Sequence, residues 1–227
     1  MCVVKAFAYG TDPLTIGNFL EKNNVDYLAV AYTNEGVKLR SSGIKLPILI
    51  LHPQIDDFDE ILEYNLEPNI YSFRILERFL SKSKTHPFHL KFNTGLNRLG
   101  FKIDDVELLY NILGDGNNIK YLFSHLGASD DVKEKAFTMG QIKLFDTISK
   151  KMSDKFNKVF NKHLLNTSGI LNYHNYQYDM VRTGIGLYGY GNDDEYNKKL
   201  KPVLTLNSII SQIHNVQKNE SVGYNRG

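Results

Sequence analysis

The feature that most constrains the fold is a regular alternation of short apolar segments with longer amphipathic segments. The apolar segments are rich in β-branched residues, which is typical of buried strands. Strands that alternate with helices form parallel βαβ units. Eight strands are predicted in this way, at residues 2–6, 27–31, 47–51, 69–72, 89–92, 119–123, 163–165 and 179–181.

The amphipathic segments between these strands predict helices on the outside of the sheet. Eight strand–helix units within about 200 residues match the lower end of the size range of the closed (β/α)8 barrel. We therefore predict an α/β fold, a TIM-type (β/α)8 barrel over residues 1–201, with an open doubly wound sheet as the alternative. The polar segment 191–202 predicts no helix after the eighth strand. The predicted helices lie near residues 14–22, 35–40, 57–64, 74–83, 106–113, 134–151 and 169–173.

The pattern changes after residue 202. Residues 203–216 alternate as one β-branched strand, residues 218–220 predict a turn, and residues 221–224 predict a second strand. We interpret residues 202–227 as the first strands of a C-terminal β-domain. Because the chain starts and stops beside strand patterns, we expect a fragment truncated at both ends.

Charge and composition limit the classes of binding partner that the sequence predicts. The formal net charge is only +2, so no strong field predicts a nucleic acid or an acidic membrane as partner. No apolar run approaches the roughly 20 residues that a membrane span needs. With one cysteine and no visible signal peptide, we expect a cytoplasmic protein. The histidines show no metal-ligand spacing, and no metal site is predicted.

Polar residues follow several predicted strands at the end where barrel enzymes carry their chemistry. The most informative of these polar residues is Lys5, which lies in an apolar segment. Burying its ammonium group there without a partner would cost several kcal/mol of folding free energy. A surface lysine at a strand end is the simpler alternative. The hydroxyl of Thr167 and the amides around Gly184 suit a phosphate monoester. A lysine and a phosphate cradle at one barrel mouth suggest pyridoxal phosphate as the cofactor.

Residues 3–10, Val-Val-Lys-Ala-Phe-Ala-Tyr-Gly, resemble the cofactor-lysine signature of bacterial alanine racemases. The amino-acid sequence of residues 7–10 and 179–189 is most similar to the corresponding segments of racemases that are fused to a D-Ala-D-Ala-adding ligase of cell-wall synthesis. The resemblance covers nearly the whole chain in the family's order. It continues through residues 28–31, 89–101, 124–126, 166–169, 179–189 and 222–224.

The resemblance implies a two-base mechanism that interconverts L-alanine and D-alanine and supplies D-alanine for peptidoglycan. Lys5 matches the lysine that holds pyridoxal phosphate as an aldimine and acts as one catalytic base. Tyr224 matches the second base, which serves the partner subunit's site in a homodimer. Two bases on opposite faces suit racemisation, because one removes the α-proton and the other returns it to the other side.

The resemblance also assigns the remaining site residues. Arg182 matches the arginine at the pyridine nitrogen, where its permanent charge disfavours protonation of that nitrogen. Arg98 matches the arginine near the cofactor's phenolic oxygen and the substrate carboxylate, and Lys91 a lysine that is often carbamylated. His125 matches a residue that supports the Arg182 contact. The phosphate contacts are matched by Tyr9, Thr167, Gly184 and Ile185, with Asn166 beside them.

The sequence departs from the family pattern at several positions, and three functional alternatives remain. Asn93 stands where the family usually has Asp. A non-catalytic pyridoxal-phosphate homeostasis protein of the same barrel fold is the alternative from another functional class. A decarboxylase of this fold normally places an acidic residue at the position of Arg182. Serine as the racemised substrate is the third alternative.

Overall fold

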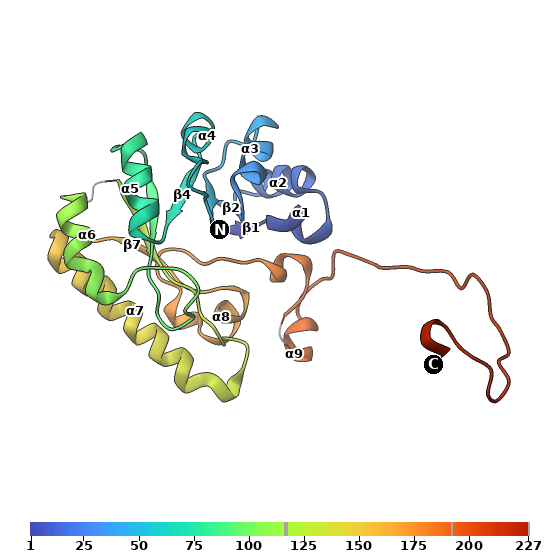
Figure 1. Ribbon diagram of the computed structural model, residues 1–227. Helices are drawn as coiled ribbons and strands as arrows, with labels where there is room; N and C mark the ends of the chain where they lie inside the picture. The colour runs from blue at the N-terminus through green and yellow to red at the C-terminus, as the bar shows by residue number, and fades with distance from the viewer. Residues whose placement is uncertain (116–117, 192, 227) are drawn as a thin grey trace.

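In the computed structural model, residues 1–115, 118–191 and 193–226 are described. Seven parallel strands form one sheet, and each strand pairs with its neighbours in chain order (Figure 1). This order is that of consecutive βαβ units, as predicted. The strands are β1 (Cys2–Val3), β2 (Leu28–Val30), β3 (Ile48–Ile50), β4 (Glu67–Ile70), β5 (Phe88–Lys91), β6 (Ile119–Phe123) and β7 (Asn161–His163).

Residues 179–183 lie between β7 and β1 and close the α/β barrel. Met180 bridges His163 of β7, and Thr183 bridges Cys2 of β1. The Val3 amide donates to the Thr183 carbonyl at 2.8 Å, which joins this segment to the first strand. The prediction of an eighth strand at 179–181 is wrong. The segment makes single bridges to two different neighbours, so no two successive residues form a ladder with either one.

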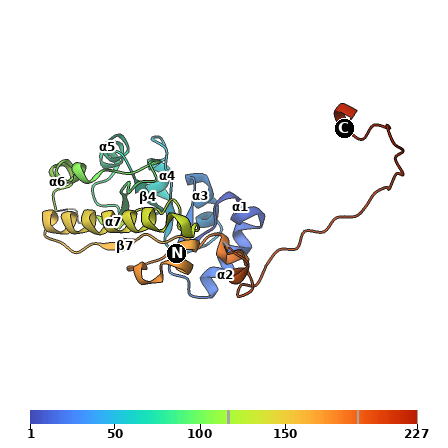
Figure 2. The same ribbon diagram turned by 90° about the horizontal axis from the view of Figure 1, so that it is seen from below.

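The helices α2 to α7 surround the strands on the outside (Figures 1 and 2). The prediction of no helix within 191–202 is wrong, because a short helix, α9, forms there. The Asp193 side chain accepts a hydrogen bond from the Tyr196 amide at 2.8 Å, a helix cap that stabilises α9. The helices are α1 (Lys5–Gly10), α2 (Pro13–Lys22), α3 (Thr33–Ser41), α4 (Phe58–Glu63), α5 (Phe73–Lys82), α6 (Val106–Leu113), α7 (Lys135–Phe156), α8 (Thr167–Asn172) and α9 (Asp194–Asn197).

The core lies between the strands and the helices around them. Phe79 of α5 packs against Phe58 of α4 and Phe88 of β5, with ring centroids 5.5 and 5.3 Å apart. All three side chains are fully buried. Burying an apolar side chain of this kind contributes about 1.5–3 kcal/mol. This packing fixes the strands whose ends carry the polar residues described below.

After Val203, whose amide still donates to the Tyr188 carbonyl, the chain forms an extended tail that leaves the barrel (Figures 1 and 2). Leu206 is 99% exposed, and no described residue pairs with the tail as a strand. The predicted strands at 203–216 and 221–224 therefore do not form, because a strand needs a hydrogen-bonded neighbour. The predicted turn at 218–220 does form, with the Glu220 amide bonded to the Gln217 carbonyl. The division into two domains stays a prediction. Among the described residues, no helix has the length and apolar character to cross a membrane.

Candidate active site

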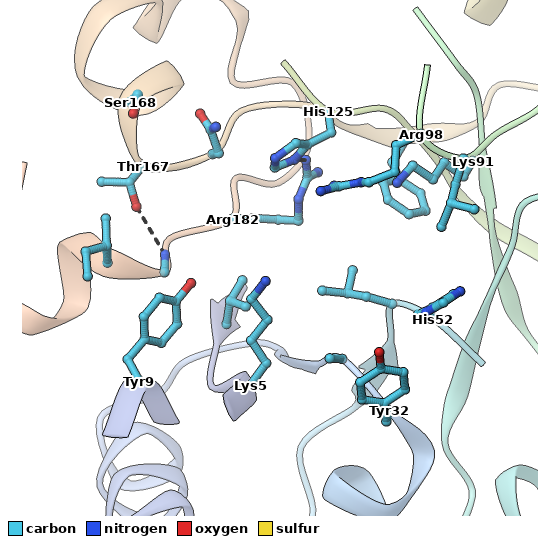
Figure 3. Close-up of a pocket in the computed structure, with 18 residues that line it drawn as sticks. Lys5, Tyr9, Tyr32, His52, Lys91, Arg98, His125, Thr167, Ser168 and Arg182 are labelled. Atoms are coloured by element: carbon cyan, nitrogen blue, oxygen red, sulfur yellow. Dashed lines mark hydrogen bonds between the residues drawn. The ribbon is translucent and has the colours of Figure 1, made fainter. Parts of the chain in front are cut away.

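A cavity of about 540 Å³ opens at the carboxyl ends of the strands (Figure 3). Lys5 and Tyr9 reach into it from one wall, and Arg182, Arg98 and Lys91 come from the opposite wall. The structure brings together every predicted site residue except Tyr224. Those lining the cavity are Lys5, Tyr9, Lys91, Arg98, His125, Asn166, Thr167, Arg182, Gly184 and Ile185.

Lys5 does not lie within a strand, contrary to the expectation from its apolar neighbours. Strand β1 ends at Val3, and Lys5 opens α1, in which residues 6–9 have positive φ angles between 48° and 57°. Left-handed backbone costs about 1–2 kcal/mol for each non-glycine residue. Such strain persists where surrounding contacts fix the backbone. The turn directs the half-buried Lys5 side chain into the cavity (Figure 3).

Glu35 of α3 holds this strained turn. Its Oε1 accepts a hydrogen bond from the Ala6 amide at 2.7 Å, and its Oε2 accepts from the Ala31 amide at 2.7 Å. One carboxylate therefore ties the residue after Lys5 to the end of β2. Sequence reasoning missed this role, although Glu35 stands three residues after Tyr32, whose amide it also binds, in the pattern of a helix start.

One corner of the cavity, around Thr167 and Gly184, carries hydroxyl groups and glycine amides. Thr167 Oγ1 accepts from the Gly184 amide at 3.1 Å and from the Gly186 amide at 3.3 Å. A Cβ atom at Gly184 would lie only 2.3 Å from the Tyr9 hydroxyl, so glycine permits this close approach. Asn166 caps α8 by accepting from the Gly169 amide at 2.9 Å. This corner is compact and polar, and suits a small oxyanion.

Arg182 is buried beside the cavity and donates to several acceptors. Its Nη2 donates to the carbonyls of Ser124 at 2.7 Å and Leu164 at 2.8 Å, and lies 3.2 Å from His125 Nδ1. Burial lowers the pKa of Arg182 to about 9. Burial and the nearby Arg182 charge hold the pKa of His125 well below its usual range. His125 is thus a neutral ring that accepts from the arginine.

Lys91 is a second buried cation, only 6% exposed. Burial, then the charges of Arg182 and Arg98, lower the pKa of Lys91 to about 7. Its ammonium lies 5.4 Å from the centre of the Phe123 ring, and no carboxylate among the described residues pairs with it. The loop that carries Arg98 is held by Asn93, whose Oδ1 accepts from the amides of residues 95 and 97.

Tyr224 lies outside the cavity. Its side chain is 100% exposed in the tail, which ends far from the barrel mouth (Figure 1). Eight lining residues were not among the predicted site residues, and the two with polar rings are Tyr32 and His52, whose rings lie 5.7 Å apart. They come from loops after different strands, so only the fold brings them together.

The chain is similar to known proteins over its full length. The family model for the alanine racemase N-terminal domain matches residues 1–192. An alanine racemase of Fusobacterium nucleatum is 37% identical over 99% of this chain and 63% of its own length. The solved alanine racemase of Clostridium difficile 630 in complex with cycloserine is 31% identical, with a TM-score of 0.79 over 88% of this chain and 58% of that one.

The fold is also similar to that of a Bartonella henselae alanine racemase with covalently bound pyridoxal phosphate. That structure is 23% identical and has a TM-score of 0.73 over 83% of this chain and 55% of its own. The chain spans less than two thirds of the length of each of these relatives. The family model and the fold agree on the barrel, and the cavity at its mouth is the candidate active site.

Proposed function

This chain belongs to the alanine racemase N-terminal domain family, and from that premise we propose that the protein interconverts L-alanine and D-alanine with pyridoxal phosphate as cofactor. The observation that carries the proposal is a single cavity with Lys5 on one wall and Arg182 on the other, beside a polar corner. This is the arrangement of groups that a phosphorylated pyridine aldehyde requires.

The residues present fit this cofactor. Lys5 is the amine that would hold it, and the Tyr9 and Thr167 hydroxyls with the Gly184 and Ile185 backbone would receive its phosphate. Gly184 fits because a side chain there would fill the corner that the phosphate needs. When bound, pyridoxal phosphate withdraws electrons from the substrate's α-carbon and makes its proton acidic.

Arg182 and Arg98 would orient the pyridine ring of the cofactor and the carboxylate of the substrate. Arg182 would face the pyridine nitrogen, and its charge would disfavour protonation of that nitrogen. Arg98 binds the substrate carboxylate. A neutral Lys91 amine can add to carbon dioxide, forming an N–C bond and releasing one proton, and the resulting carbamate would pair with Arg98. The low pKa of Lys91 supports this modification, because only the neutral amine reacts.

Lys5 moves the α-proton on one face of the substrate, and Tyr224 moves it on the other. Because Tyr224 lies outside the cavity of its own chain, we propose that it acts in the site of a second subunit of a homodimer. The D-alanine formed would supply peptidoglycan synthesis in the cytoplasm.

The test is conversion of L-alanine to D-alanine by the full natural polypeptide with added pyridoxal phosphate, with L-serine run in parallel. We expect alanine to racemise faster than serine. Cofactor binding without any racemisation would contradict the proposal and support the non-catalytic homeostasis role instead.

A further inference from the structure

A chain of buried polar side chains runs from Arg182 through the interior of the barrel. Arg182 Nη1 lies 2.5 Å from His163 Nδ1. His163 Nε2 lies 2.9 Å from His89 Nδ1, and His89 Nε2 lies 3.0 Å from Glu67 Oε2. These residues come from β7, β5 and β4, so the chain crosses the barrel from the cavity to its far side.

The donor at one end of this chain, Arg182, and the acceptor at the other end, Glu67, dictate the same direction for every hydrogen bond between them. A guanidinium only donates, so His163 must accept at Nδ1 and carry its proton on Nε2. His163 then donates to His89 Nδ1, which leaves the His89 proton on Nε2. His89 therefore donates to the Glu67 carboxylate, which can only accept. Each ring has one permitted tautomer as long as both ends of the chain are in place.

The two rings are neutral and the two ends are charged. Burial, followed by the Arg182 charge, holds the pKa of His163 well below its usual range, and burial also lowers the pKa of His89. Burial opposes ionisation of Glu67, but bonds from His89 and Lys120 outweigh it and lower the pKa of that carboxyl. Glu67 is the only buried carboxylate among the described residues.

Stacking holds both rings in place. His163 stacks on Phe123 with ring centroids 4.6 Å apart, and His89 stacks on Tyr121 at 4.9 Å. The rings therefore cannot swing away to relieve a wrong tautomer. Glu67 is held in turn by Lys120 at 2.7 Å and by the Tyr27 hydroxyl at 2.9 Å.

We propose that His163, His89 and Glu67 are positioning residues that fix the orientation of the Arg182 guanidinium. If Glu67 is lost, the Lys120 ammonium that donated to it is left without its acceptor beside His89 Nε2. His89 Nε2 accepts from this ammonium only when the His89 proton lies on Nδ1, where it faces the proton on His163 Nε2. The two ends of the chain then demand opposite tautomers, and a shift of the His163 proton to Nδ1 opposes the Arg182 donor and displaces the guanidinium. The chain thus transmits the state of a carboxylate on one side of the barrel to the cavity wall on the other.

The first test is independent of cofactor and activity. Nitrogen NMR of ¹⁵N-histidine-labelled protein without cofactor at pH 7 reports which ring nitrogen carries the proton. We expect both His89 and His163 to be protonated on Nε2 only. Glu67→Gln keeps an acceptor oxygen and should preserve both tautomers, whereas Glu67→Met should convert His89 to a mixture. A proton on Nδ1 of His163 in the wild type, or unchanged tautomers in Glu67→Met, would overturn the proposal.

The second test rests on the proposed function and uses the full natural polypeptide with cofactor. At metal sites, removing a residue that supports a metal ligand typically costs about 10–100-fold in affinity or activity, and we take this range as the scale for the support of Arg182. We expect Glu67→Met to lower kcat by about that factor while KM for alanine changes less than about twofold. Tyr27→Phe is the matched control, since it removes one bond to Glu67 but keeps its charge and His89, and it should leave kcat nearly unchanged. Equal losses of kcat in both variants would indicate general loosening of the barrel and contradict the proposal. If the wild type does not racemise alanine, the NMR result still decides whether the chain positions Arg182.

Discussion

Lys5 and Tyr224 are the two proposed proton-transfer groups, and they lie in regions of opposite character. Lys5 belongs to the barrel mouth, where Glu35 binds the next amide along the chain and buried strands fix the wall opposite. Tyr224 belongs to the tail, which is extended and exposed. The difference teaches that this chain builds the side of the site that carries Lys5 from its own contacts. The position of the second group depends on contacts outside this barrel.

The largest effect is expected from Lys5→Ala. The variant should lose the visible absorption band that pyridoxal phosphate gains on binding through Lys5. Activity should fall by more than about 10⁴-fold, because acid–base catalysis alone contributes up to about that factor. Absorbance spectroscopy and a racemisation assay measure both effects, with Lys22→Ala at the exposed end of α2 as control. A band that persists in Lys5→Ala would show that the barrel mouth does not hold the cofactor in this way.

A one-sided effect is expected from Tyr224→Phe in the full natural polypeptide. The variant keeps the cofactor band, because Tyr224 lies outside the barrel. Exchange of the α-proton should slow by about 10²–10⁴-fold for one enantiomer of alanine and much less for the other. Proton NMR in deuterated water, started from each enantiomer, measures the two rates. Equal slowing for both enantiomers would contradict a second base on the opposite face.

The same contrast explains which elements could be predicted from the sequence. The helix predicted at 106–113 has the observed bounds of α6, since its apolar spacing is a local property. The predicted strand at 203–216 also shows a clear local pattern, yet no strand forms, because pairing is a property of two segments. The strand predicted at 2–6 ends early, since the left-handed turn uses ordinary residue types such as Phe7 and Tyr9.

The residues of the candidate site also fall into those that local sequence motifs predict and those that only long-range contacts reveal. Motif order predicted the residues that line the cavity, because they lie in short contiguous blocks at strand ends. Glu35 and the Glu67–His89–His163 chain escaped prediction. Ala6 lies 29 residues from Glu35, and the two contacts within the chain join residues 22 and 74 positions apart, so only the closed barrel brings these partners within bonding distance.

A stability comparison tests whether the tail is as independent as it looks. Phe79→Ala should lower the free energy of unfolding by about 3–5 kcal/mol, because it leaves a cavity in the core. Leu206→Ala should change it by less than about 0.5 kcal/mol, because an exposed side chain loses no packing. Urea unfolding of both variants measures the difference. A loss of several kcal/mol in Leu206→Ala would show that the tail packs against protein in solution.

The smallest effect on the proposed site is expected from Glu35→Ala, which loosens the turn that carries Lys5 at the barrel mouth. Glu35→Ala releases the amides of Ala6, Ala31 and Tyr32 from their shared carboxylate. A hydrogen bond to a charged group contributes about 1.5–3 kcal/mol, and a loss of 1.4 kcal/mol corresponds to roughly a tenfold change in binding. We expect the dissociation constant of pyridoxal phosphate to rise about tenfold, measured by titration of the visible band.

Glu21→Ala is the matched control for this variant. Glu21 also binds two backbone amides through its carboxylate, but these belong to Lys45 and Leu46, which do not line the cavity, whereas Glu35 binds the amides of the lining residues Ala31 and Tyr32. Both variants should lose similar stability, and only Glu35→Ala should weaken cofactor binding. If the two variants bind the cofactor equally well, the Ala6 contact does not hold Lys5 in place. The strand ends alone would then determine the geometry of the barrel mouth. The mouth would differ from the tail in its burial and not in its specific hydrogen bonds.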